Sequence, residues 1–160
     1  MHEDLSARIN DLLDRIEHAA VATVSADGQP WNTPVYFAKH GDSFYWTSRR
    51  DAQHSTNIRH NKRALLVVFD SSREDASGAA AYVEANVVEL ADDGDIQAGL
   101  EVIYRRRDKP VPRVAQFSSS SVHAIYRAQA LRMWSNVLHT SGEVPWDERV
   151  EVVMTRTWKD

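Results

Sequence analysis

Residues 20–48 read AVATVSADGQPWNTPVYFAKHGDSFYWTS, and this stretch decides the fold. Residues 20–24 are short, apolar and rich in β-branched side chains, and Asp27-Gly28 is a typical hairpin turn. Over residues 31–38 the side chains alternate as they do in a strand with two different faces. A second turn precedes the aromatic residues 43–48. The stretch therefore predicts three consecutive strands joined by tight turns.

Two prolines interrupt the second of these strands. Pro30 and Pro34 have no backbone N–H and cannot donate to a neighbouring strand. We therefore expect this strand at an edge of the sheet, or at an interruption where its backbone groups face a ligand.

The remaining sequence adds helices and further strands. Leu5, Ile9, Leu12, Leu13 and Ile16 have helical spacing and predict an N-terminal helix over about residues 4–18. After it we expect a short helix at 51–60 capped by Asp51, a buried strand at 64–70, a loop at 71–78, a bent or bulged strand at 82–90, a helix at 92–107, and strands at 122–134 and 150–155. This order predicts one mainly β domain over residues 1–160: an antiparallel, nearly closed barrel with helices at its ends.

Composition restricts the function. The 160 residues include 19 Lys and Arg, 23 Asp and Glu, and no Cys, which gives a net charge of −4. Without Cys there is no disulfide framework, iron–sulfur cluster, thiolate zinc site or cysteine nucleophile, so redox chemistry needs a borrowed cofactor. Mild acidity argues against nucleic acid as a partner. The absence of an apolar run of about 18 residues, and an acidic N-terminus, predict a cytoplasmic protein without a membrane span.

The junction between the third strand and the short helix is the most informative candidate site. Thr47 and Ser48 end the strand, Arg49 and Arg50 follow, and a helix begins directly afterwards. Hydroxyls, guanidinium groups and the N–H groups of a helix N-terminus together suit a phosphate. A polar turn with solvated arginines is the alternative interpretation.

Several ordered segments resemble one known family, the pyridoxamine 5′-phosphate oxidase-like flavin-binding split barrels. The segments are Ala22 to Pro30, Thr33-Pro34-Val35-Tyr36-Phe37, Phe44-Tyr45-Trp46-Thr47-Ser48, His54-x-x-Asn57-Ile58-x-x-Asn61, Tyr82-Val83-Glu84-Ala85, Tyr126-Arg127-Ala128 and Trp134-Ser135-Asn136. The resemblance implies a homodimer with FMN in two clefts at the subunit interface.

The resemblance also implies a set of cofactor-binding residues. Asn32, Thr33, Pro34 and Val35 would lie along the isoalloxazine ring and ribityl chain. The ribityl-phosphate end would be lined by Trp46, Thr47 and Ser48, and the phosphate gripped by Gln53, His54 and Ser55, with Arg50 supplying charge. Trp134 would reach the ring from the partner subunit.

The sequence departs from true pyridoxamine phosphate oxidases in its basic residues. Thr33 and Ala38 stand where those enzymes carry Arg and Lys, and His54 replaces a lysine. Residues 146–149 only loosely match their C-terminal arginine segment. These departures argue against vitamin B6 oxidation, and a histidine makes phosphate binding more sensitive to pH than a lysine would.

Other candidate sites are weaker. The seven histidines lack metal-ligand spacing, so no metal is expected. Asp92, Asp93 and Asp95 fit a helix start better than a calcium loop. Arg105, Arg106 and Arg107 read as a solvated helix end. No side chain stands out as a catalytic acid, base or nucleophile, and flavin chemistry does not require one.

Three hypotheses follow. The leading hypothesis is an FMN-dependent oxidoreductase acting on a small molecule. The second is a carrier or binding protein for flavin, deazaflavin or haem on the same dimeric barrel. The third is a structural dimer that has lost its cofactor.

Overall fold

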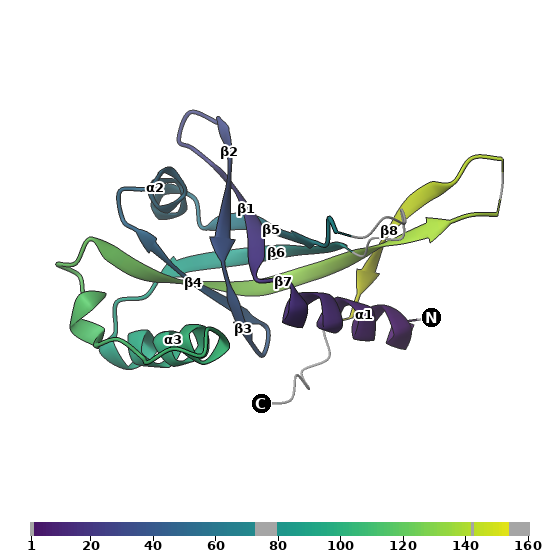
Figure 1. Ribbon diagram of the computed structural model, residues 1–160. Coiled ribbons are helices and arrows are strands. Elements are labelled where there is room, and N and C mark those ends of the chain that lie inside the picture. The colour runs from purple at the N-terminus through teal and green to yellow at the C-terminus, as the bar shows by residue number, and fades with distance from the viewer. Residues whose placement is uncertain (1, 73–79, 142, 154–160) are drawn as a thin grey trace.

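The computed structural model describes residues 2–72, 80–141 and 143–153, with the side chains of residues 2–4 left aside. Most of the predicted loop at 71–78 and the last two residues of the predicted strand 150–155 lie outside the described residues. Figure 1 shows the arrangement. The elements are α1 (His2–Arg15), β1 (His18–Val24), β2 (Pro30–Tyr36), β3 (Ala38–His40), β4 (Ser43–Arg49), α2 (Gln53–His60), β5 (Arg63–Phe69), β6 (Ala80–Glu89), α3 (Asp93–Arg106), the short 3-10 helix η1 (Val114–Gln116), β7 (His123–His139) and β8 (Trp146–Val152).

All strand pairs in the sheet are antiparallel, and their order is β2-β1-β5-β6-β7-β4-β3, with β8 added beside β7. The two ends of this order, β2 and β3, are neighbours in the chain, separated only by Phe37. The Phe37 N–H donates to the Glu17 carbonyl at 3.0 Å, which continues the β1–β2 pairing to the point where the chain turns toward β4. One bent strand therefore joins both ends of the sheet and curves it into an open barrel.

β2 lies at an end of the strand order, as its prolines predict. Pro34 pairs in register with Ala20, and Pro30 with Val24. Because β2 is the last strand on this side of the order, the N–H groups that the prolines lack are missing from an edge strand and not from the middle of the sheet. The predicted bulge in the long strand is confirmed too, because the β6–β7 register shifts between Glu84 and Ala85.

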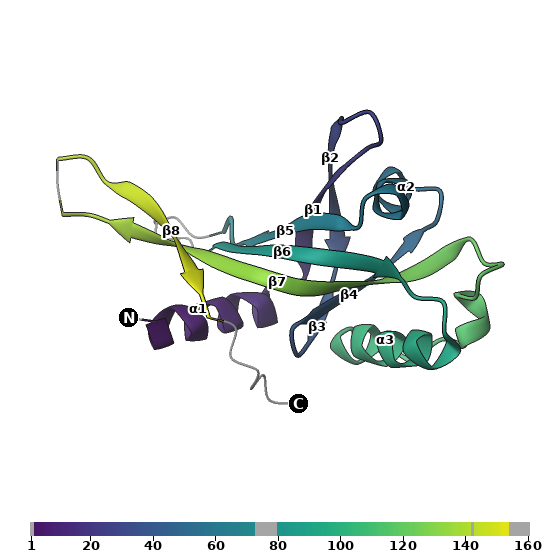
Figure 2. The same ribbon diagram turned by 180° about the vertical axis from the view of Figure 1, so that it is seen from behind.

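Two apolar clusters position the helices. In the first, α1 buries Leu5, Ile9, Leu12 and Leu13 against the barrel interior, where each side chain contributes roughly 1.5–3 kcal/mol. In the second, α3 packs on the outside of the sheet through buried side chains that include Leu100 and Ile103. In Figure 2, α1 and α3 lie at the bottom of the view and α2 at the top, and the β7–β8 hairpin extends away from the rest of the barrel. Ile58 of α2 belongs to the first cluster, so α1 and α2 both pack on the barrel interior and α3 on the outer face.

Asp92 caps α3 as its place before the helix predicts: its carboxylate accepts hydrogen bonds from the N–H groups of Gly94 (2.9 Å) and Asp95 (3.1 Å).

The expected cap of α2 is wrong. The N-cap residue is Ala52, which has no side-chain acceptor, and Asp51 instead accepts two hydrogen bonds from the Arg49 guanidinium, at 2.8 and 2.7 Å. The Arg49 guanidinium therefore binds the carboxylate that could otherwise have accepted hydrogen bonds from the first N–H groups of α2.

The expected solvated end of α3 is confirmed for Arg105, which is exposed, and is wrong for Arg106 and Arg107. Arg106 donates to the carbonyls of Leu13 (2.9 Å), Asp14 (3.1 Å) and Ile16 (2.8 Å), which α1 leaves without helical partners at its C-terminus. The Arg107 guanidinium lies 4.1 Å from the centre of the Tyr36 ring. These arginines attach α3 to α1 and to β2.

Candidate functional site

The junction of β4 and α2 brings Ser48 and His54 together. Ser48 Oγ and His54 Nε2 lie 2.7 Å apart, and the imidazole tautomer decides which of them donates. His54 is buried, and this burial lowers the pKa of its imidazole below the ordinary value of 6.5. At neutral pH His54 is therefore an uncharged hydrogen-bonding group.

The first turn of α2 adds backbone donors to this pair. Because Ala52 has no side-chain acceptor, no residue at the N-cap occupies the N–H groups of the first turn. Ser55, in the same turn, is buried, and its hydroxyl donates to the Arg49 carbonyl at 2.8 Å. That bond fixes the start of the helix against the end of β4.

A polar network behind His54 holds its ring in place. The ring of Tyr126 meets His54 edge-on, with 6.5 Å between the ring centres, and stacks on Trp46 at 5.8 Å. The Tyr126 hydroxyl donates to a Glu89 carboxylate oxygen at 3.1 Å, and Arg50 Nε donates to the other oxygen at 2.7 Å.

The Arg50 guanidinium therefore makes its hydrogen bonds within the chain. It also donates to the carbonyls of Ser118 and Ser121, so it holds the loop before β7 against the β4–α2 junction. Arg49 is paired with Asp51. The positive spot expected at Arg49 and Arg50 is wrong, because both guanidinium groups face carboxylates.

A small polar cavity of about 220 Å³ lies between the β1–β2 turn and α2. Gln53 and Trp31 line it, and Gln53 donates to Asn57, whose amide in turn donates to Thr23 at 3.0 Å. The Trp31 indole donates to the Thr33 hydroxyl at 2.9 Å. Gln53 therefore lines the α2 side of this cavity and Trp31 the β2 side, and Thr33 contacts the cavity lining through its hydrogen bond with Trp31.

The other residues expected on β2 point in two directions. Val35 is buried in the barrel, whereas Asn32 and Pro34 are exposed and alternate with Thr33 and Val35 along the strand. Trp46 is fully buried, and its indole nitrogen has no hydrogen-bond partner among the described residues. Trp46 therefore packs beneath the junction, against the Tyr126 ring.

Trp134 lies far from the junction in the same chain. Ser48 pairs with Ala124 on β7, and Trp134 follows ten residues later on that strand. At about 3.3 Å a residue, roughly 30 Å separates Trp134 from Ser48. One chain does not bring the expected ring-contacting tryptophan to the expected phosphate residues.

Residues missed from the sequence are Thr23, Trp31, Asn57, Glu89 and Tyr126. Trp31 and Asn57 stand beside predicted site residues, but Glu89 and Tyr126 reach the junction only through the pairing of β7 with β4 and β6.

Within the part of the chain that the structure describes, no three His, Cys, Asp or Glu side chains group to hold a metal ion. No helix among those residues has the length and hydropathy to cross a membrane.

Comparisons with known proteins identify what this arrangement resembles. A family model described as pyridoxamine 5′-phosphate oxidase matches residues 5–133. A search of curated proteins finds no match.

Solved structures share the fold. The heme storage protein HutZ from Vibrio cholerae is 16% identical, with a TM-score of 0.65 over 81% of this chain and 92% of its own. A conserved hypothetical protein, Rv2991, from Mycobacterium tuberculosis is 19% identical, with a TM-score of 0.67 over 81% and 82%. An F420 reductase is 22% identical, with a TM-score of 0.58 over 78% and 94%. These likenesses confirm the mainly antiparallel split barrel.

Proposed function

The chain belongs to the pyridoxamine 5′-phosphate oxidase family, and on that premise we propose that it is a homodimeric flavoprotein that binds FMN non-covalently and oxidises or reduces a small molecule. The β4–α2 junction is the observation that carries the proposal. A hydroxyl, a buried imidazole and the uncapped N–H groups of a helix meet there, and these are the donors that a phosphate monoester accepts.

The donors at the junction suit the phosphate of FMN, although none of them carries a positive charge at neutral pH. Because one proton is used between Ser48 and the neutral His54, this pair offers one hydrogen bond to a phosphate oxygen, from the Ser48 hydroxyl or from His54 Nδ1 according to the tautomer, and the first-turn N–H groups of α2 offer the others. Gln53 orients the ribityl side, and the network through Tyr126 and Glu89 supports the His54 ring. When bound, FMN supplies the redox centre, because its ring accepts and returns hydride. The protein's part is to bind, orient and exclude water.

The position of Trp134 supports a site made by two chains. Pro34, Ala20, Val67, Tyr82 and Trp134 form one row across the sheet from β2 to β7. Four strand spacings of about 4.8 Å place Trp134 about 19 Å from Pro34, so a ring lying along β2 does not reach Trp134 of the same chain. A second copy supplies Trp134 when the two outer faces pack together.

The outer face of that row is apolar enough to be an interface. Val24 and Phe69 are 39% and 54% exposed, and Ala20, Ala22, Leu65 and Val67 are half-buried beside them. A contiguous exposed apolar face of this kind marks an interaction site.

Reconstitution with FMN tests the proposal. Purified protein incubated with FMN and passed through gel filtration is expected to keep flavin absorbance and to quench flavin fluorescence. Protein that emerges without flavin, and that leaves the fluorescence unchanged, would refute FMN binding.

A carrier of flavin, deazaflavin or haem is the second candidate. It is favoured by the pairing of Arg49 with Asp51 and of Arg50 with Glu89, which leaves neutral donors at the junction. Sustained NAD(P)H oxidation by the loaded protein with an electron acceptor present supports the oxidoreductase, and a single reduction without turnover supports the carrier.

A further inference from the structure

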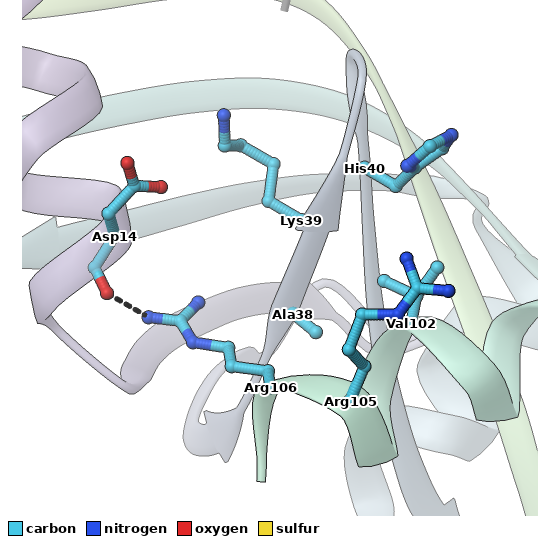
Figure 3. Close-up of a pocket in the computed structure, with 7 residues that line it drawn as sticks. All are labelled: Asp14, Ala38, Lys39, His40, Val102, Arg105 and Arg106. Carbon is cyan, nitrogen blue, oxygen red and sulfur yellow. Dashed lines mark hydrogen bonds between the residues drawn. The ribbon is translucent and has the colours of Figure 1, made fainter. Parts of the chain in front are cut away.

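One part of the outer sheet surface lies outside the reach of the helices. On this surface α3 packs on β3, β4 and β7, whereas α1 and α2 pack on the barrel interior. Figure 3 shows β3 between α1 and α3, where Arg106 of α3 donates to the Asp14 carbonyl of α1 at 3.1 Å. Among the described residues, no helix encloses the outer face of β1, β5 and the first half of β6 in this way. We call this the outer face.

The row of side chains through Val67 is small on one side of β5 and large on the other. The register partners of Val67 are Ala20 on β1 and Tyr82 on β6. One strand further out, Pro34 pairs with Ala20 and Trp134 pairs with Tyr82. Register partners in antiparallel strands point to the same face of a sheet, so these side chains form one line with β5 at its centre.

The neighbouring row through Leu65 has the same asymmetry and adds charge. On the β1 side it carries Ala22 and then Asn32, and on the β6 side Glu84 and then Arg132. The neutral residues of this row therefore lie on one side of β5, and the charged residues lie on the other.

A two-fold axis along β5 exchanges the two sides of each row. We propose that a second copy of this chain packs on the outer face about that axis, an arrangement that rests on the homodimer proposed above. Tyr82 then packs on the partner's Ala20, and Trp134 lies over the partner's Pro34. Phe69, which is 54% exposed on β5, covers the partner's Phe69 on the axis itself. The same patch thus serves both copies, as a two-fold interface requires.

An axis in the other direction, across the strands, suits the side-chain sizes less well. Each residue would stay on its own side of β5, so Tyr82 would meet the partner's Tyr82 and Ala20 would meet the partner's Ala20. The large side chains would then be overpacked while the alanines left a gap, and both defects cost stability. The alternation of sizes therefore selects the axis along β5.

The charges of the outer face agree with the same axis. It sets Glu84 against the partner's Ala22 and Arg132 against the partner's Asn32, so no like charges meet in this row. Arg63, at the start of β5 on the axis, forms an ion pair with Glu84 of its own chain. This pair neutralises the two Arg63 side chains where they approach each other at the rim.

Cross-linking of single cysteines tests the axis, because the chain has no cysteine of its own. Each variant is treated with a short bis-maleimide in the absence of FMN. Arg63→Cys, at an exposed position on the axis, is expected to cross-link to its own copy, and no cross-link there would overturn the proposal. Asn32→Cys and Arg132→Cys each lie four strand spacings, about 19 Å, sideways from their own copies and are expected to remain uncross-linked.

A heterodimer of the Asn32→Cys and Arg132→Cys chains, co-expressed with two tags and purified by both, completes the test. Its two cysteines face each other across the interface, so we expect a cross-linked yield about tenfold or more above that of either homodimer. Val122→Cys, in the loop before β7, is the control that should not cross-link.

Three results would overturn the proposed axis: tags that do not co-purify, a heterodimer that does not cross-link, or equal yields in all samples. Cross-linking of Asn32→Cys or Arg132→Cys to its own copy would also place the axis elsewhere. A correctly cross-linked dimer that does not retain flavin would instead refute FMN binding and leave this interface in place.

Discussion

At the residue scale, Ser48 and His54 decide whether the junction is a phosphate site. We expect Ser48→Ala and His54→Ala each to weaken FMN binding about 10- to 100-fold and riboflavin binding less than about threefold, because riboflavin has no phosphate to lose a contact. Fluorescence titration with both ligands measures the difference. His60→Ala, on the exposed end of α2, is the control, and equal losses for the two ligands would place the phosphate elsewhere.

The buried imidazole also links folding to pH. Burial lowers the pKa of His54 in the folded state, so the unfolded chain binds its proton more readily. This contribution to stability is fully present above the unfolded pKa of about 6.5 and is lost as the pH falls through the lower folded pKa. We expect the urea midpoint to fall more between pH 7.5 and pH 5.5 in the unmodified protein than in His54→Gln. Parallel losses would contradict a buried neutral His54, and His60→Gln should follow the unmodified protein.

At the element scale, Arg106 joins two helices. We expect Arg106→Leu to lower the free energy of unfolding by about 2–3 kcal/mol, because α1 carbonyls lose charge-assisted hydrogen bonds. Chemical denaturation measures the change, with Arg105→Leu, at an exposed position on the same turn, as the control. A similar small loss in both variants would show that the α1 ends need no such partner.

Local patterns predicted the elements, and two side-chain pairings, one local and one long-range, produced the errors. The apolar stripe of α1, the prolines of β2 and the cap at Asp92 follow from neighbouring residues, and the structure confirms them. The hydrogen-bond partners of Asp51 and Arg50 depend on which neighbouring group binds each side chain in the folded chain. Arg49 takes the Asp51 carboxylate, and Glu89, 39 residues from Arg50, takes its guanidinium. No periodicity in the sequence reports such a pairing.

At the scale of the whole molecule, the proposed cofactor site takes residues from two chains. That Trp134 acts from a partner is a prediction of the sequence, and the strand register adds that Trp134 lies far from Ser48 and from β2 within one chain.

Breaking the proposed interface should therefore remove the cofactor. Phe69 is already 54% exposed, so Phe69→Glu is expected to leave the monomer folded while it disrupts the dimer and weakens FMN binding at least tenfold. Light scattering after gel filtration gives the mass, and circular dichroism checks the fold. Val122→Glu, at a 55% exposed position in the loop before β7, is the control. A monomeric variant with full FMN affinity would place the whole site in one chain.

Complementation between two damaged subunits tests the two-chain site most directly. His54→Ala and Trp134→Ala homodimers are each expected to bind FMN weakly at both sites. A heterodimer of the two variants, co-expressed with different tags and purified by both, contains one cleft with an intact His54 and an intact Trp134 from opposite chains. FMN titration of this heterodimer is expected to show one tight site per dimer with the affinity of the unmodified protein. A heterodimer that shows only weak binding would contradict the account.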